Sequence, residues 1–243
     1  MAGDNRERHT LLDISLAGRR RILEELTQGG REAGVCGPLL LPEEFGGLGE
    51  REPGVTFTGI PGIVRREDFH PRPGFIPLGF SSWASGPHGR TRLATFAAPD
   101  EVKRSRTPVE VLEACVAEGR ELTRTPALRA VAALTATGFE RARWGVWGSV
   151  GLELATGIRY THDRSDLDLL LVPDTGPTRA LCAAWLRVTE GAEKRFGIRI
   201  DAEIRLANGY DVSLKECAQG GVKVLAKGLR DVRLLPVEEF LPS

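Results

Sequence analysis

The sequence has no net charge, and it is poor in lysine. Its 243 residues include 33 basic and 33 acidic side chains, and the two signs are balanced in both halves of the chain. Proteins that hold nucleic acid or anionic membranes by general electrostatics carry a positive excess, so both classes are disfavoured. Only five of the 33 basic residues are lysine. Arginine is therefore favoured by composition, and a single arginine carries little meaning by itself.

Cysteine pairs and long apolar runs are also missing. The four cysteines, at positions 36, 115, 182 and 217, have neither the spacing of zinc ligands nor that of a disulfide framework. No run approaches the roughly 18 apolar residues of a transmembrane helix. The N-terminus is charged and lacks the apolar stretch of a signal peptide. We therefore expect a cytoplasmic protein, with 41% hydrophobic residues to build a core.

Chemistry-bearing residues gather in the second half of the chain. Gly148 and Ser149 lie between a strand-like segment and a short helix-like segment. Glycine there lets the backbone approach a phosphate closely, and the amide groups at a helix N-terminus can bind the phosphate. Asp166 and Asp168 begin a strand that continues as the apolar run 169–172. Alternation puts both carboxylates on one face, and such a pair favours a hard divalent cation. The combination predicts magnesium-dependent transfer of a nucleotidyl-type group.

A third carboxylate is expected from a neighbouring strand. In residues 197–206 the apolar and charged residues alternate, so Asp201 and Glu203 share a face. Either residue is a candidate for the third ligand, and Asp201 is the better one. The alternative interpretation is an exposed strand face with compensating charges at alternate positions, which is common on solvated sheets.

The order of predicted elements indicates an α+β fold with two parts. Residues 8–28 are predicted to form a helix that ends at Gly29, residues 37–59 a loop-dominated stretch, and residues 60–66, 75–83 and 90–98 three strands. We predict an N-terminal domain at 1–106, with a small antiparallel sheet that binds substrate or partner. Residues 107–243 are predicted to form a nucleotidyltransferase-like catalytic domain that starts with a helical connector and carries helices on one face of a mixed sheet.

Motifs spread along most of the chain resemble one family, the malonate decarboxylase holo-acyl-carrier-protein synthases, also called phosphoribosyl-dephospho-CoA transferases. The Gly-Ser and Asp-x-Asp motifs are common to all nucleotidyltransferases, and the arginine-rich N-terminal half narrows the match. The matching segments are Arg8–Leu12, Ile63–Arg66, Ile76–Phe80, Arg90–Phe96, Gly148-Ser149, Ser165–Leu170, Asp201–Glu203, Asn208-Gly209 and Val222–Lys227.

The resemblance implies a specific reaction. Enzymes of this family transfer the phosphoribosyl-dephospho-CoA group of 2′-(5″-triphosphoribosyl)-3′-dephospho-CoA to a serine of the acyl-carrier subunit of malonate decarboxylase and release pyrophosphate. The resemblance also implies that Asp166 and Asp168 bind the metal and that Gly148 and Ser149 contact a phosphate. The chain departs from the family at Ala202, where glycine is usual, and in the arginine segment, where Thr91 or Leu93 stands in place of glutamine.

Further basic residues are candidates for binding the phosphates of the donor. Guanidinium groups bind phosphate through paired hydrogen bonds, and the donor carries a triphosphate and a diphosphate. On the expected helix near Glu216, two lysines lie four residues apart on one face and are predicted to contact donor phosphates or the carrier; a solvated helix face explains them equally well. The six candidates are Arg65, Arg66, Arg90, Arg92, Lys223 and Lys227.

Two other functions are compatible with the residues. One is a nucleotidyltransferase that uses ATP or another nucleotide on a different protein or small-molecule acceptor. The other is an interaction module that has kept the fold without activity, which the intact Asp166 and Asp168 disfavour. A measurement of magnesium-dependent nucleotide binding distinguishes the two, because an enzyme of this class should show such binding and an inactive interaction module should not.

Overall fold

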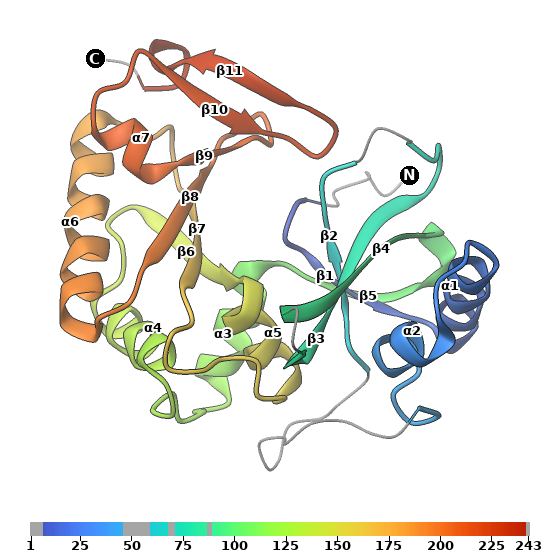
Figure 1. The fold of residues 1–243 in the computed structure, drawn as a ribbon. Helices are drawn as coiled ribbons and strands as arrows, with labels where there is room; N and C mark the ends of the chain where they lie inside the picture. The colour runs from blue at the N-terminus through green and yellow to red at the C-terminus, as the bar shows by residue number, and fades with distance from the viewer. Residues whose placement is uncertain (1–6, 46–58, 68–70, 87–88, 242–243) are drawn as a thin grey trace. The chain divides into compact units, whose positions relative to one another are not determined.

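The computed structural model describes residues 7–45, 59–67, 71–86 and 89–241. The chain divides into two compact units, each with its own sheet (Figure 1). Unit 1 contains residues 1–107 together with Leu152–Tyr160, and unit 2 contains Pro108–Gly151 and residues 161–243. The α+β fold and the N-terminal β region expected from the sequence are confirmed.

Unit 1 is built on a five-stranded antiparallel sheet with the strand order β4-β3-β2-β1-β5. Buried aliphatic side chains such as Leu12, Val64, Leu78 and Leu93 form its core. The three strands expected between residues 60 and 98 are present, and two short strands join them. The five are β1 (Leu11–Ile14), β2 (Gly62–Val64), β3 (Ile76–Gly86), β4 (Gly89–Ala97) and β5 (Val102–Arg106).

The predicted helix over residues 8–28 is wrong at its beginning. Residues 11–14 form β1, which pairs with β2 and β5, and helix α1 (Leu16–Gln28) begins only after Ser15. The Ser15 hydroxyl accepts a hydrogen bond from the Gly18 amide, which is a regular N-cap. Strand pairing with distant segments overrides the local helical pattern, and the cap marks the true start.

Helix α2 (Ala33–Leu40) corrects the expected loop over residues 37–59, of which residues 46–58 lie outside the described part. The buried guanidinium of Arg19 forms hydrogen bonds with three separate segments of unit 1. It donates to the carbonyls of Ile14 (2.9 Å), Leu40 (3.2 Å) and Ile60 (2.7 Å). These three acceptors connect β1, α2 and the chain before β2, and burial lowers the pKa of Arg19 to about 10.

Unit 2 is built on a six-stranded mixed sheet with the order β11-β10-β9-β8-β7-β6. Strands β7 and β8 run parallel, and the other neighbours are antiparallel. Its strands are β6 (Ala142–Trp147), β7 (Leu167–Pro173), β8 (Ile200–Arg205), β9 (Asp211–Ser213), β10 (Lys223–Lys227) and β11 (Val232–Pro236).

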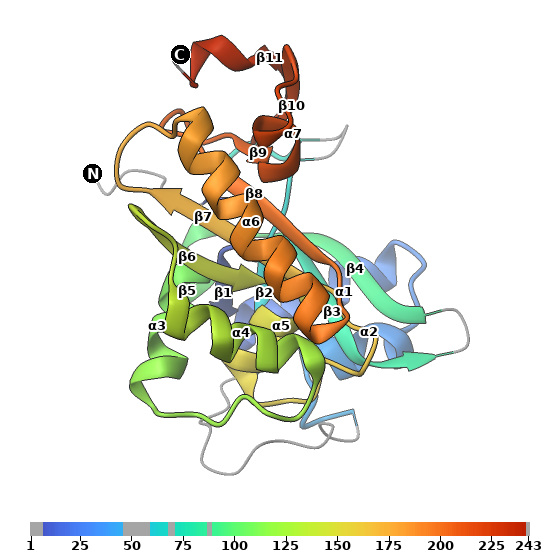
Figure 2. The same cartoon turned by 90° about the vertical axis from the view of Figure 1, so that its left-hand side faces the viewer.

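Helices α4, α6 and α7 belong to the apolar side of this sheet. Fully buried residues of β7 and β8, such as Leu169, Leu171 and Ile204, lie on that side, and α6 contributes Trp185, whose indole N–H donates to the Glu140 carbonyl (2.9 Å). Figure 2 shows α6 in front of β8 and running in nearly the same direction as this strand. The helices of unit 2 are α3 (Pro108–Ala117), α4 (Pro126–Thr137), α6 (Arg179–Phe196) and α7 (Leu214–Ala218), together with the first half of α5 (Gly148–Thr156).

The predicted helical position of Lys223 and Lys227 is wrong, because both residues lie on strand β10. Helix α7 ends at Ala218, and Gly220 adopts a positive φ of 79°, which reverses the chain before the strand. The two lysines still share a face, because residues four positions apart lie on the same face of a strand, as they do on a helix.

Helix α5 links the two halves of the sequence in an unexpected way. It begins in unit 2, whereas its second half and the following residues through Tyr160 group with unit 1. Within unit 1, Arg106 donates to the Ala155 carbonyl (3.0 Å) and to Asp13 (3.2 Å), and Tyr160 donates to the Ser81 carbonyl (3.2 Å).

Among the described residues, no helix has the length and apolar character that crossing a bilayer requires.

Candidate metal and phosphate site

The turn between β6 and α5 is shaped to accept a carboxylate. Strand β6 ends at Trp147, and Gly148 begins the helix with a φ of 63°, which favours glycine. A Cβ atom at position 148 would lie 2.1 Å from Oδ2 of Asp168. Gly148 is therefore required both by its backbone conformation and by the close approach of this carboxylate. The first turn of α5, which includes Ser149, provides amide N–H groups that favour anions.

Three aspartates gather on the sheet beside this turn. Asp168 pairs with Trp147 in the antiparallel register and stands directly opposite Asp201 in the parallel register of β7 and β8. Asp166 immediately precedes β7 and shares the face of Asp168. The side chains of Asp166 and Asp201 are 47% and 61% exposed. Two of the three carboxylates are thus open to solvent, and the carboxylate of Asp168 is half-buried.

The electrostatic environment of Asp168 is unusual. Burial raises the pKa of its carboxyl to about 7, and the negative charges of Asp201, Asp166 and Glu203 add to the rise, while Arg199 opposes it. Without a cation, the site therefore holds a proton on Asp168 at mildly acidic pH. A divalent cation would remove the repulsion among the carboxylates and favour the ionised form.

Arg199 is the positively charged group that contacts the exposed aspartates. Its guanidinium donates from Nε to Oδ2 of Asp166 (3.2 Å), and one terminal nitrogen donates to Oδ2 of Asp201 (3.0 Å). The same nitrogen lies 3.1 Å from Oδ2 of Asp166. Sequence reasoning placed Arg199 on the charged face of this strand without giving it a role. The alternating pattern shows that Arg199 shares a face with Asp201. The parallel register that brings Asp166 close to Arg199 cannot be read from the sequence.

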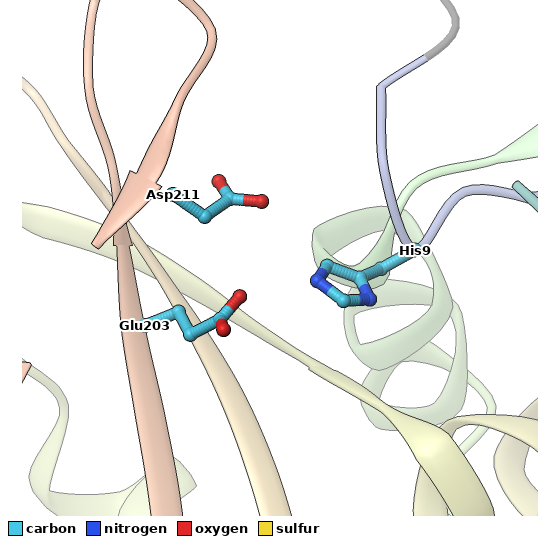
Figure 3. A group of neighbouring side chains, drawn as sticks. All are labelled: His9, Glu203 and Asp211. Carbon is cyan, nitrogen blue, oxygen red and sulfur yellow. The ribbon is translucent and has the colours of Figure 1, made fainter. Parts of the chain in front are cut away.

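Glu203 has a different environment from Asp201. It stands opposite Leu170 in the parallel register, and its buried carboxylate accepts a hydrogen bond from Nζ of Lys227 (2.7 Å). Asp211 on the neighbouring strand β9 is paired with Arg205, which donates to both of its carboxylate oxygens. Figure 3 shows Glu203 and Asp211 projecting from the same side of β8 and β9. Sequence reasoning missed Asp211 and Arg205 because their pairing depends on the β8–β9 register.

The predicted arginines belong to unit 1. Arg65 and Arg66 follow β2, and Arg90 and Arg92 lie on β4. Arg90 donates to the carbonyl of Tyr160 and lies 5.7 Å from the centroid of its ring. Burial lowers the pKa of Arg90. Part of its hydrogen-bonding capacity is therefore used inside unit 1.

Lys223 and Lys227 also differ in their surroundings. Lys223 is exposed at the start of β10, while Lys227, at its end, pairs with Glu203 as described. The backbone of Lys227 is also opposite Asp211 in the β9–β10 register. Lys227 is consequently the predicted lysine that lies near the carboxylates of the sheet.

The three aspartates fit a hard divalent cation. All three offer oxygen atoms, which Mg²⁺ prefers, and two are open to the solvent or substrate that would complete an octahedral shell. The bare Cα of Gly148 leaves room for the third carboxylate. An α+β sheet that presents acidic pairs beside a glycine–serine turn has the arrangement of nucleotidyltransferase-type enzymes.

Comparison with known proteins identifies the family within this class. The chain belongs to the phosphoribosyl-dephospho-CoA transferase family: the models of the MdcG N-terminal domain and the MdcG C-terminal domain match residues 7–108 and 111–238. Both family models are described as those of phosphoribosyl-dephospho-CoA transferase, which makes this chain a member of a transferase family.

Several curated relatives carry the same name. The phosphoribosyl-dephospho-CoA transferase of Xanthomonas axonopodis pv. citri is 34% identical over 76% of this chain and 83% of its own length. Those of Pseudomonas syringae pv. tomato and Pseudomonas putida are 35% and 32% identical, each over 74% of this chain and 80% and 81% of their own lengths. No solved structure matches the chain significantly.

Proposed function

We propose that this protein transfers the phosphoribosyl-dephospho-CoA group from 2′-(5″-triphosphoribosyl)-3′-dephospho-CoA to a serine of the acyl-carrier subunit of malonate decarboxylase. The observation that carries the proposal is the opposition of Asp168 and Asp201 across two parallel strands, with Asp166 on the same face. This set can hold Mg²⁺ against a triphosphate. The family name supports the identity of the transferred group.

In this proposal, Asp166, Asp168 and Asp201 are the metal ligands. Bound Mg²⁺ supplies neutralisation of the triphosphate charge. Asp201 is favoured over Glu203 as the third ligand because it faces Asp168 directly, whereas the Glu203 carboxylate is buried and held by Lys227. Glu203 then acts in the site by keeping the ammonium group of Lys227 in place.

Phosphate binding is assigned to the turn and to basic side chains. The amide groups at Gly148 and Ser149 contact a donor phosphate at the start of α5. Lys227 is oriented by Glu203, and Lys223 lies on the same face of β10. Arg65, Arg66, Arg90 and Arg92, which belong to unit 1, are further candidates for binding phosphate, as expected from the sequence.

The transfer is a single displacement at phosphorus. The serine oxygen of the carrier forms a bond to the phosphorus next to the ribose, and the bond from that phosphorus to the pyrophosphate oxygen breaks. The serine proton passes to Asp201, and pyrophosphate leaves with the electron pair of the broken bond. Asp166 and Asp168 stay ionised throughout and would hold the cation that neutralises charge on the leaving pyrophosphate.

Mass spectrometry of the apo carrier subunit tests the reaction. The carrier is incubated with the protein, the donor and Mg²⁺, and we expect a mass increase equal to one phosphoribosyl-dephospho-CoA group together with release of pyrophosphate. Asp166→Asn should abolish the increase, and Glu203→Gln should reduce it less than Asp201→Asn. Arg187→Gln, a change at an exposed position of α6, is the matched control and should leave the reaction unchanged.

The same assay separates this function from transfer of another nucleotide. ATP in place of the donor should not modify the carrier. Modification of the carrier by ATP, with no reaction of the triphosphoribosyl donor, would instead favour a nucleotidyltransferase of different donor specificity.

A further inference from the structure

The contact of Arg199 with two of the proposed metal ligands has a consequence for how a metal enters. Arg199 immediately precedes β8, two residues before Asp201, so both side chains lie on the same face of the strand. Its guanidinium lies 3.0 Å from Asp201 and 3.1 Å from Asp166, in each case at Oδ2. One cationic group thus joins aspartates from two different strands.

A guanidinium and a divalent cation compete for these two carboxylates. Arginine remains charged at any physiological pH, so the contact is not relieved by loss of a proton. A metal ion that binds through Oδ2 of Asp166 and Asp201 takes the oxygens that the guanidinium contacts, and one that binds through Oδ1 lies beside a positive charge that repels it. Binding of the metal at these two ligands therefore favours the departure of Arg199.

Arg199 is free to make this movement. Its side chain is 64% exposed, and its bonds to the aspartates are those of solvent-exposed ion pairs, which contribute little to stability. Arg199 lies directly before the strand, so a guanidinium displaced from the carboxylates would remain beside the site. A triphosphate bound there would offer it phosphate oxygens for paired hydrogen bonds.

We infer that Arg199 is an internal counter-ion that competes with the metal for Asp166 and Asp201 and passes to the phosphates of the donor when the metal binds. This inference rests on the proposed function, because it takes the three aspartates as the metal site. It makes Arg199 a substrate-binding residue for the triphosphate. Metal and donor then favour each other's binding, and this coupling is reciprocal.

Two binding measurements on the full chain test the exchange without any turnover. Mn²⁺ replaces Mg²⁺ as a spectroscopic probe, and its binding to the donor-free protein is followed by electron paramagnetic resonance. Binding of inorganic tripolyphosphate is measured by calorimetry at saturating Mn²⁺, so that the metal site is filled and Arg199 is released from the aspartates. The variants are Arg199→Gln, Arg199→Lys and the control Arg187→Gln, which removes one positive charge from exposed helix α6.

The two affinities should change in opposite directions. Arg199→Gln should bind Mn²⁺ roughly 3- to 10-fold more tightly than the wild type, as expected for the loss of two exposed ion pairs. It should bind tripolyphosphate several-fold more weakly. Arg199→Lys, which keeps the charge but loses the planar fork, should fall between the two in both measurements. Arg187→Gln should resemble the wild type.

Specific results would overturn the inference. Mn²⁺ affinity in Arg199→Gln that is no higher than in the wild type, or equally raised in Arg187→Gln, refutes the competition. Equal affinity of the wild type and Arg199→Gln for tripolyphosphate refutes the transfer to the donor. If Arg199→Gln does not fold, the same criteria apply to Arg199→Lys.

Failure of the proposed metal site is recognised separately. Asp166→Asn and Asp168→Asn should each weaken Mn²⁺ binding in the otherwise unchanged protein. Full Mn²⁺ affinity in both variants would show that the aspartates are not the metal site, and both the proposed function and the inference on Arg199 would then be wrong.

Discussion

Replacement of Asp168 by asparagine should make the metal-free protein more stable while it removes metal binding. The pKa of the Asp168 carboxyl is raised from 3.8 to about 7, first by burial and then by neighbouring carboxylates. A raised carboxyl pKa means that the folded protein prefers the protonated form. The free energy of unfolding therefore falls as pH rises from about 4 to about 7.

The size of the effect follows from the shift. A difference of about 3 pKa units corresponds to about 4 kcal/mol as an upper limit, at about 1.4 kcal/mol per unit. The neighbouring charges are partly exposed and screened, so we expect about 1–2 kcal/mol of stabilisation in Asp168→Asn at pH 8. For a chain of this size, that raises the melting temperature by about 2–8 °C.

Thermal and urea unfolding at pH 5 and pH 8, with EDTA present, measure this prediction. The stabilisation should be largest at pH 8 and small at pH 5, where the wild-type carboxyl is already protonated. Saturating Mg²⁺ should stabilise the wild type and leave Asp168→Asn unchanged. A variant that is less stable than the wild type at pH 8, or a gain that does not depend on pH, would refute the assignment of a buried, repelled carboxyl.

Three further predictions concern the surroundings of the site and the core of unit 1. Gly148→Ala should lose metal binding and about 1–3 kcal/mol of stability, because the new Cβ would overlap Asp168 and the φ of 63° is unfavourable for alanine; calorimetry that finds wild-type metal affinity would contradict this. Lys227→Met should cost about 2–4 kcal/mol in urea unfolding by removing the ammonium group that donates to the buried Glu203 carboxylate, and adding Glu203→Gln should recover part of it; equal stability of the single and double variants would refute the pairing. Arg19→Lys should cost about 2–4 kcal/mol, since an ammonium group cannot reach all three carbonyls, and a melting temperature within about 2 °C of the wild type would contradict it.

Much of the site could be predicted from local sequence patterns. Glycine at the end of a strand and the alternation of Asp166, Leu167 and Asp168 depend only on neighbouring residues, so they are readable without a fold. The same holds for the strand at residues 200–205. The site roles themselves stay predictions until binding is measured.

Elements that depend on distant partners were predicted less well. Residues 11–14 have a helical pattern locally but form a strand because β2 and β5 pair with them on both sides. Lys223 and Lys227 lie on a strand and not on the expected helix, because the chain reverses at Gly220 and then pairs with β9 and β11. In both cases, tertiary pairing outweighs the short-range preference of the chain.

The sequence by itself determined the identity of the acidic residues, the face that each one occupies and the family to which the chain belongs. Only the tertiary structure decided which acids meet. The parallel register of β7 and β8 sets Asp168 opposite Asp201 and brings Arg199 to Asp166, whereas Glu203 is paired with Lys227 from a strand further along the sheet. Strands β7 and β8 are parallel and are joined through a long helix, so no turn sets their register, and it depends on packing between residues far apart in the chain.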